Sequence, residues 1–167
     1  QEGEALLKRS KSVGFVLGPG QVGRIREAVR TVSQGRRAVF VGFDAETDYN
    51  YSTIFRKQST RGMVTVIEGC DEFCTFCIVP YTRGREASRT VEDVVAEVRS
   101  LTQAGIREIE LLGQTINAYT CPDTGARLAD LLRRVATIDG AERVRFITSH
   151  PRHFDDDLIR VLAEHPN

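Results

Sequence analysis

Residues 62–77 read Gly-Met-Val-Thr-Val-Ile-Glu-Gly-Cys-Asp-Glu-Phe-Cys-Thr-Phe-Cys, an apolar run followed at once by three closely spaced cysteines. The apolar run at 63–67 is typical of a short buried β-strand. We predict a second strand at 108–112 and a third at 144–148. The cysteines lie in a long stretch, 68–89, that we expect to form the loop leaving the first strand.

Helical patterns separate these strands and follow the last one. Apolar residues recur at helical spacing on three segments, namely Val91, Val94, Val98 and Leu101, then Leu128, Leu131, Leu132 and Val135, then Leu158, Ile159 and Leu162. Alternating strands and helices with short returns predict parallel strands joined by right-handed crossovers. The fold class is therefore α/β, with ligands expected at the carboxyl ends of the strands.

Local signals mark the helix ends. Thr90, with Asp93 three residues later, predicts the N-terminal cap of the first helix, and Gly105 predicts its end. The acidic run at 155–157 predicts the N-terminus of the last helix rather than a metal site.

The first 60 residues predict a separate unit. A strand at 13–17 is followed by a turn at 18–20 and by apolar residues at helical spacing, which are Val22, Ile25, Val29 and Val32. The chain turns polar from residue 44 to residue 60. We predict the end of one domain at 1–35, a linker at 36–60 and the first half of a second domain at 61–167.

Composition narrows the class of protein. The chain has 167 residues, and its 23 Lys and Arg balance its 23 Asp and Glu, so the formal net charge is +0. A hydrophobic fraction of 41% argues against disorder, and the sequence contains neither a signal peptide nor an apolar run of the roughly 20 residues that span a bilayer. Zero net charge removes the simplest argument for a nucleic-acid binder. Because Gln1 is not an initiator Met, we expect this to be a stretch of something longer.

Cys70, Cys74 and Cys77 form a C-x3-C-x2-C pattern within one loop. Three thiols cannot all pair in disulfides, and the α/β pattern suggests a cytosolic protein, in which clustered cysteines hold metals or act in catalysis. Zinc needs four ligands, and the next candidates, Cys121 and His150, lie far along the chain. The spacing favours an iron–sulfur cluster with one open iron over zinc or over three unrelated structural cysteines.

The C-x3-C-x2-C pattern with Phe76 before the last cysteine resembles the signature of radical S-adenosylmethionine (SAM) enzymes. The neighbouring residues are similar to the methylthiotransferase family within that group. The segments that carry this resemblance are 68–70, 78–84, Glu86, Ser88, Arg89, 111–114 and 148–151. The stretch 14–18 resembles the end of that family's N-terminal domain.

Two branches of the family differ after the second strand. The tRNA-modifying branch (MiaB) reads Gln-Asn-Val-Asn there, and the branch acting on a ribosomal protein reads Gln-Asp-Thr-Thr. This chain reads Gln114-Thr115-Ile116-Asn117, keeping the second Asn of the first pattern and departing from it at Thr115. The segments 80–84 and 148–151 also resemble the tRNA branch more than the other branch. The alternatives are methylthiolation of a ribosomal protein and a non-catalytic module stabilised by zinc.

The resemblance implies a partial TIM-like radical SAM barrel, preceded by the end of an α/β domain. It implies that Cys70, Cys74 and Cys77 hold a 4Fe-4S cluster whose open iron takes SAM, and that the enzyme methylthiolates isopentenylated adenosine beside the tRNA anticodon. A flavodoxin or ferredoxin would donate electrons, in the cytoplasm and without a membrane. Contacts with tRNA are expected mostly from regions outside this chain, which we expect to be catalytically incomplete alone.

Further residues are candidates for binding SAM. The resemblance places Phe76 near the adenine, although the ring could instead pack the loop, and Gly113 and Gln114 near the methionyl amino group. Asn117 and Ser149 are weaker candidates on the same edge.

The remaining polar candidates have simpler interpretations. Three arginines, Arg83, Arg85 and Arg89, could meet phosphate or carboxylate groups. Cys121 is predicted to be incidental and His150 to shape a turn. The other two histidines, His153 and His165, are predicted to lie on the surface.

Overall fold

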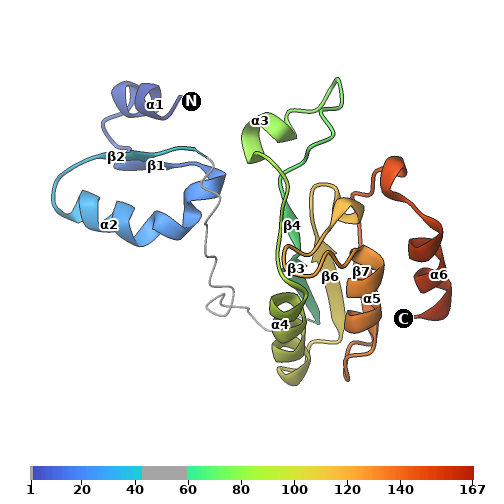
Figure 1. The fold of residues 1–167 in the computed structure, drawn as a ribbon. Helices are drawn as coiled ribbons and strands as arrows, with labels where there is room; N and C mark the ends of the chain where they lie inside the picture. Colours follow the sequence, from blue (N-terminus) through green and yellow to red (C-terminus); the bar gives the residue numbers. More distant parts are fainter. Residues whose placement is uncertain (1, 43–59) are drawn as a thin grey trace.

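The computed structural model describes residues 2–42 and 60–167, which form two groups of elements (Figure 1). In the first group, strands β1 and β2 pair in parallel, with Phe15 opposite Ala38 and Leu17 opposite Phe40. The elements of this group are α1 (Gly3–Arg9), β1 (Phe15–Leu17), the 3-10 helix η1 (Pro19–Arg24), α2 (Ile25–Ser33) and β2 (Ala38–Phe40). The sequence predicted a strand at β1 and a helix at α2 in this order, but neither α1 nor β2.

The predicted linker, 36–60, starts too early. Residues 38–40 form β2 and belong to the first sheet, because their backbone groups complete the pairing with β1. Most of the remaining linker, 43–59, lies outside the described residues. The other domain limits stay predictions.

The apolar face of α2 and its preceding turn is open to solvent. Val22, Ile25, Val29 and Val32 are each 36–54% exposed, whereas Ala28 on the same helix is fully buried. The helical spacing therefore predicted the helix correctly, but a sheet of two described strands covers little of its apolar face.

The second group is built on a parallel sheet with the strand order β3-β6-β7. Its strands are β3 (Arg61–Thr65), β6 (Glu108–Leu112) and β7 (Arg143–Phe146). Met63 lies opposite Glu110, and Glu110 lies opposite Arg145. This register places the carboxyl ends of all three strands along one edge, as the alternating sequence pattern predicted.

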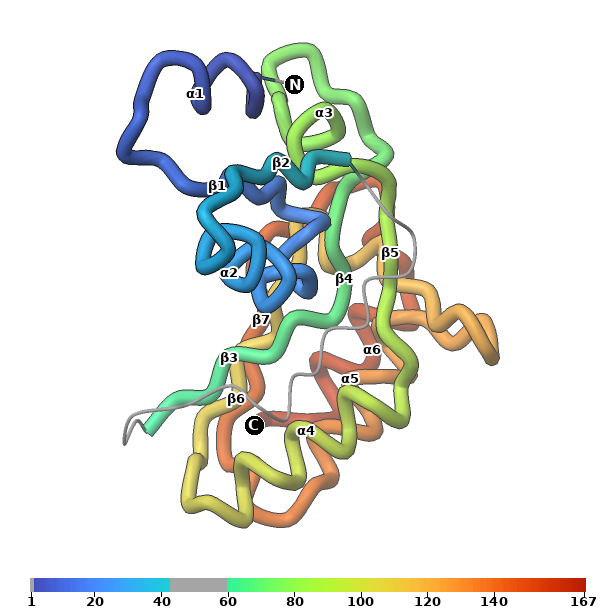
Figure 2. The backbone as a smooth tube through the Cα atoms, turned by 90° about the vertical axis from the view of Figure 1, so that its left-hand side faces the viewer, coloured from blue at the N-terminus to red at the C-terminus, as the bar shows by residue number. Residues whose placement is uncertain are grey.

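Three helices cover one face of this sheet. Helices α4 (Val91–Gln103) and α5 (Leu128–Ala136) pack on the strands, and α6 (Asp156–Glu164) lies beside α5 (Figures 1 and 2). The core between the layers includes Val64, Val98, Ile109, Leu111 and Leu131, all fully buried. Apolar burial at roughly 25 cal/mol per Å² is the main favourable contribution to the stability of such a layer.

The predicted helix caps form. The backbone N–H of Asp93 donates to the Thr90 hydroxyl oxygen at 3.1 Å, and the Thr90 hydroxyl donates to the Asp93 carboxylate at 2.7 Å. In α6, the Asp155 carboxylate accepts a hydrogen bond of 2.8 Å from the Leu158 N–H. Both caps satisfy amides that a helix N-terminus leaves without intrahelical partners.

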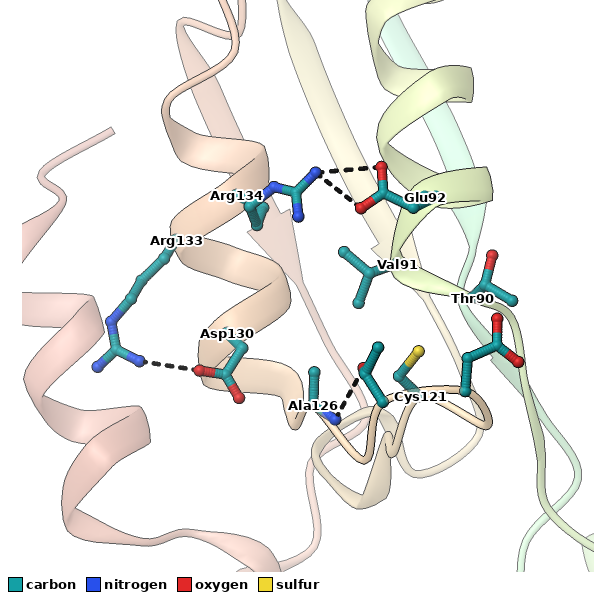
Figure 3. A pocket seen from close by; sticks show the side chains of 10 residues that line it. Thr90, Val91, Glu92, Cys121, Ala126, Asp130, Arg133 and Arg134 are labelled. Carbon is teal, nitrogen blue, oxygen red and sulfur yellow. Dashed lines mark hydrogen bonds and ion pairs between the residues drawn. The ribbon is translucent and has the colours of Figure 1, made fainter.

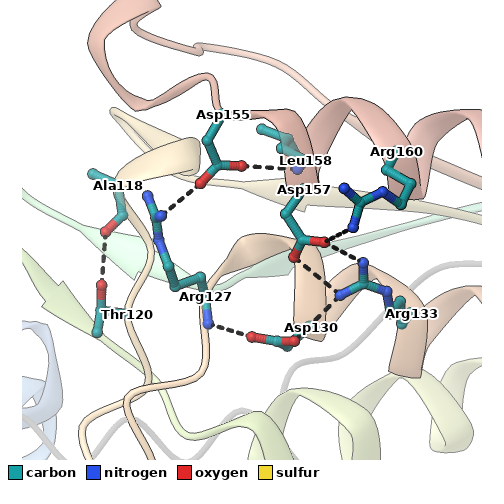
Figure 4. A network of polar contacts seen from close by, with 9 residues as sticks. All are labelled: Ala118, Thr120, Arg127, Asp130, Arg133, Asp155, Asp157, Leu158 and Arg160. Atoms are coloured by element: carbon teal, nitrogen blue, oxygen red, sulfur yellow. Dashed lines mark hydrogen bonds and ion pairs between the residues drawn. The ribbon is translucent and has the colours of Figure 1, made fainter.

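An ion-pair network joins α5 to α6 (Figure 4). The Arg133 guanidinium lies 2.6 Å from the Asp157 carboxylate and 3.4 Å from that of Asp130, while Arg127 contacts Asp155 at 2.5 Å. These side chains are a third or more exposed, so the network orients α6 more than it stabilises the fold.

The face of the sheet turned away from the helices carries paired charges. Arg61 contacts Glu110 at 3.0 Å, and Glu108 contacts both Arg143 and Arg145, at 3.3 and 3.2 Å. Opposite charges face each other across neighbouring strands, which favours the observed register.

The loop after β3 is more ordered than the sequence predicted. A two-strand antiparallel ribbon closes its ends, with Ile67 opposite Ser88, and a one-turn helix lies between them. These elements are β4 (Ile67–Glu68), α3 (Val79–Arg83) and β5 (Ala87–Ser88), and the later loops hold the 3-10 turns η3 (Ile116–Ala118) and η4 (Pro151–His153). Among the described residues, no helix combines the length and apolar character needed to cross a bilayer.

We predict that Leu111→Ala on β6 lowers the free energy of unfolding by about 2–5 kcal/mol, because the removed side chain is fully buried and leaves a cavity. Urea unfolding followed by circular dichroism measures this change. Leu162→Ala is the matched control: its side chain is 46% exposed, and its loss costs about 1 kcal/mol or less. Equal losses in the two variants would place the core elsewhere.

Candidate cofactor site at the carboxyl edge of the sheet

The loops that leave β3, β6 and β7 are tied together at one edge. The Thr148 hydroxyl donates to the Gly113 carbonyl at 2.6 Å, and the Ile116 N–H donates to the Thr148 carbonyl at 3.2 Å. The Asn117 side chain makes two hydrogen bonds of 2.8 Å with the backbone of His150. These bonds fix the second and third loops against each other.

Gly69 starts the cysteine loop in a conformation that needs glycine. Its φ is +76°, and a Cβ placed there would lie 2.1 Å from the Arg85 carbonyl oxygen. The Gly69 N–H donates to the side-chain oxygen of Gln114 at 2.6 Å. The loop therefore leaves β4 in close contact with its own returning end and with the end of β6.

Cys70 is the most deeply placed of the three loop cysteines. The residue is 6% exposed, and its sulfur is hydrogen-bonded to the Thr115 hydroxyl at 3.0 Å. Thr115 is itself 4% exposed. Sequence reasoning noticed Thr115 only as a departure from a family pattern, yet it is the residue that contacts the Cys70 sulfur.

Cys74 and Cys77 lie farther out on the loop and are partly exposed. The Cys77 N–H donates to the Cys74 carbonyl at 2.9 Å, which forms a turn between the two residues. All four cysteines of the chain are free thiols, so none is used in a disulfide.

The donor set suits a cluster better than a single ion. Thiolates around one tetrahedral zinc at about 2.3 Å would hold their sulfurs about 3.8 Å apart. In residues 2–42 and 60–167, the three sulfurs do not all lie within 4.8 Å of one another. A four-iron cube binds each thiolate at a different iron, and three free thiols on one loop are the type of donor that such a cluster takes.

Aromatic residues line the outer part of the loop. The rings of Phe73 and Tyr81 pack edge to face with centroids 5.8 Å apart. Phe76 is 91% exposed, so its ring does not pack the loop, which was one of the two expectations for it. Ser149 is also exposed at this edge.

Charged partners hold the two ends of the loop together. The Asp71 N–H donates to the Glu86 carboxylate at 3.1 Å, the Glu86 N–H donates to the Asp71 carboxylate at 3.4 Å, and Arg85 contacts Asp71 at 2.7 Å. Nearby, burial raises the pKa of Glu68, against the attraction of Arg83. Two of the predicted anion-binding arginines thus have carboxylates of the chain itself as neighbours.

The third of these arginines, Arg89, also pairs within the protein. Its guanidinium lies 2.7 Å from the Glu97 carboxylate and donates to the Thr65 carbonyl at 2.8 Å. The Tyr119 hydroxyl donates to the Arg89 carbonyl at 2.8 Å. Arg89 therefore fastens the end of the cysteine loop to β3 and α4.

Glu72 connects the cysteine loop to the loop after β7. Its side chain is 6% exposed and lies 2.5 Å from His153 and 2.8 Å from Arg152. The hydrogen bond from His153, aided by the nearby charge of Arg152, holds the pKa of Glu72 below its ordinary value despite burial. His153, predicted to lie on the surface, keeps 26% of its side chain exposed while its ring contacts Glu72.

The remaining predicted residues have structural contacts of their own. His150 caps the turn η4, since its Nδ1 accepts from the Arg152 N–H at 3.3 Å, as expected for a turn-forming residue. Gly113 allows a close approach, because a Cβ there would lie 2.4 Å from Ile67. The side chains of Gln114 and Asn117 hold neighbouring loops, as described above, and roles for these residues in binding a cofactor stay predictions.

Cys121 lies in a separate pocket of about 350 Å³ near the N-termini of α4 and α5 (Figure 3). A hydrogen bond from the Thr124 side chain and bonds from nearby backbone amides lower the pKa of Cys121 to about 7, although burial opposes this. The Glu92–Arg134 ion pair, at 3.0 Å, bridges the two helices beside the pocket.

Comparison with protein families decides the class of the chain. The family model described as the radical SAM superfamily matches residues 64–167, which include the whole cysteine loop and the β3-β6-β7 sheet apart from the first residues of β3. The chain belongs to the radical SAM superfamily. The predicted fold and the identification of C-x3-C-x2-C as a radical SAM signature are thereby confirmed.

Curated relatives are similar in sequence along nearly the whole length of the chain. Proteins named tRNA-2-methylthio-N(6)-dimethylallyladenosine synthase are 41% identical in Koribacter versatilis and 44% identical in Histophilus somni, each over 99% of this chain. The counterpart in Bdellovibrio bacteriovorus is 42% identical over 100% of the chain. The chain spans 36–38% of the length of these relatives.

Solved structures support the fold. Two structures of TsrM, a radical SAM methyltransferase from Kitasatospora setae, align over 89% of this chain with TM-scores of 0.56 and 0.57. The identities are 22% and 23%, and the alignments cover 36% and 34% of those chains. One of the two holds cobalamin and a 4Fe-4S cluster.

We predict that Gly69→Ala destabilises the chain markedly more than Gly105→Ala. Both glycines have positive φ, which costs an alanine about 1–2 kcal/mol, but only Gly69 has backbone atoms within reach of the new Cβ. The free energies of unfolding, measured in urea, compare the two variants. Equal destabilisation would mean that the loop relaxes freely at Gly69.

Proposed function

We propose that the protein is a tRNA methylthiotransferase that modifies isopentenylated adenosine beside the anticodon. In this proposal Cys70, Cys74 and Cys77 hold a 4Fe-4S cluster, and SAM binds at its open iron. The main observation in support of the proposal is the three-cysteine loop, which is anchored at the carboxyl edge of a parallel sheet. The relatives named as tRNA-2-methylthio-N(6)-dimethylallyladenosine synthases support the choice of substrate.

The contacts of the loop suit a redox cofactor that must be held in one position. Cys70 is fixed through Thr115, and the loop entrance is fixed through Gln114. When bound, the cluster supplies the electron for the reductive cleavage of SAM. Cys74 and Cys77, being partly exposed, can take up the cluster without unfolding the loop.

Nearby side chains are candidates for holding SAM. Phe76 is exposed beside two ligands, so its ring is free to stack on an adenine. The Gln114 amide oxygen already accepts from Gly69, and its NH2 group can donate to a carboxylate. Asn117 and Ser149 lie on the two neighbouring loops, where they can contact the polar parts of the cofactor.

The proposal includes partners. A flavodoxin or ferredoxin would supply the electron, and tRNA would bind largely outside these residues, because the chain carries no net charge to attract phosphates. We place the reaction in the cytoplasm, where both tRNA and reduced electron carriers are present.

Anaerobic reconstitution with iron and sulfide tests the cluster. The chain should acquire about four irons and four sulfides and a charge-transfer absorbance, and Cys74→Ser should lose most of both. Cys121→Ser is the matched control, because Cys121 lies in the separate pocket and should leave the iron content unchanged. A colourless product whose zinc is lost in Cys74→Ser would contradict the proposal and favour the zinc-stabilised module.

Nucleoside analysis of tRNA tests the substrate. A strain lacking the gene should accumulate tRNA without the methylthio group, and the wild-type gene should restore the group whereas the Cys74→Ser allele should not. Intact tRNA modification together with an unmodified ribosomal protein would instead assign the chain to the other branch.

A further inference from the structure

Glu72, His150 and His153 bring three potential metal ligands together. One ligand atom from each residue lies within 4.8 Å of the other two, and among residues 2–42 and 60–167 this is the single such group. Glu72 comes from the cysteine loop, and the two histidines come from the loop after β7. The group is therefore assembled by the fold from residues 81 positions apart, the separation of Glu72 and His153.

The chemistry of the group matches a divalent transition metal. Two imidazoles and one carboxylate form a ligand set used by zinc enzymes and by non-haem iron sites, in which protein ligands occupy three positions and leave others open. The Glu72 side chain is 6% exposed and the two histidine side chains are 30% and 26% exposed, so the site is sheltered but reachable.

The distances require small adjustments. Two ligands about 2.0–2.1 Å from a tetrahedral ion stand about 3.3 Å apart. The Glu72 Oε1–His153 Nε2 distance of 2.5 Å would widen, and the Glu72 Oε2–His150 Nδ1 distance of 3.8 Å would narrow. The two distances involve different oxygens of the carboxylate, so rotation of the side chains must bring one ligand atom from each residue, all within 4.8 Å of one another, to the spacing around an ion.

Three existing contacts compete with an ion. The first is the His153 Nε2–Glu72 Oε1 hydrogen bond of 2.5 Å, which the ion replaces as it binds both atoms. The Arg152 guanidinium lies 2.8 Å from Glu72 Oε2, and the Arg152 N–H donates to His150 Nδ1 at 3.3 Å. The Arg152 side chain is 70% exposed, so it can turn into water when a cation takes its place. The backbone hydrogen bond is long and is the weaker competitor.

We propose that Glu72, His150 and His153 form a second metal site, which binds a divalent transition ion such as Zn²⁺. The ion joins the cysteine loop to the loop after β7, because its ligands come from both. The site is distinct from the three cysteines, and its existence does not depend on the proposed tRNA function.

Metal binding is tested in two forms of the protein. The cluster-loaded chain, whose cysteines are occupied, should retain one Zn²⁺ per chain by elemental analysis after removal of free metal. A chain with Cys70→Ser, Cys74→Ser and Cys77→Ser should still bind one Zn²⁺ by calorimetry. It should also give visible d–d bands with Co²⁺ that report nitrogen and oxygen ligands.

Substitutions at the site decide between a metal centre and a simple ion-pair network. In the serine background, Glu72→Gln and His150→Asn should each weaken Zn²⁺ binding at least about tenfold, because each removes a ligand. Arg152→Gln should bind at least as tightly as its parent, since it removes a competitor and no ligand. His165→Asn is the control for a histidine elsewhere and should change nothing.

The outcomes are separable from folding and from the tRNA reaction. Far-UV circular dichroism identifies any variant that fails to fold. Glu72→Gln and His150→Asn change different loops, so if one of them misfolds, the other still tests the site. Absence of Zn²⁺ binding in the serine background, or equal affinity in its Glu72→Gln variant, would overturn the proposal. A failed tRNA assay would leave these measurements unaffected.

Discussion

Parallel pairing of β3, β6 and β7 is the constraint on which the rest of the site depends. Because the three strands run the same way, their outgoing loops meet at one edge, where backbone and side-chain groups join them. The Thr148–Gly113 and Asn117–His150 contacts connect the second and third loops, and Gly69–Gln114 connects the first and second. A slip of one residue in register would turn the side chains of a strand to the opposite face and break this arrangement.

The helices and strands with a periodic pattern could be predicted from the sequence, because the signals that define them lie within a few neighbouring residues. Strand β6 occupies the predicted residues, Glu108–Leu112, because Ile109 and Leu111 alternate with two glutamates, which is the pattern of a strand with one apolar face. Thr90 and Asp155 were recognisable as caps since a cap acts on amides only two or three residues away. The radical SAM signature was readable because its three cysteines lie within eight residues.

Contacts between distant residues were not predictable in the same way. Thr115 is hydrogen-bonded to the Cys70 sulfur although the two residues are 45 positions apart in the sequence. His153 contacts Glu72 although they are 81 positions apart. No rule of sequence spacing applies at such separations. The short elements β4, β5 and α3 have too few residues to show a period. For α2, periodicity revealed an apolar stripe but could not show that little of it would be covered.

The closed form of the cysteine loop has a consequence for how a cofactor is acquired. Asp71 and Glu86 bond reciprocally, and Gly69 packs against Arg85, so contacts of the chain itself close the stretch between them into a ring. The conformational entropy of closing that ring is lost when the polypeptide folds. A cofactor that binds in this loop therefore meets a preorganised site, which raises its affinity. The same closed loop slows exchange of the bound cofactor, because the loop has little freedom to open.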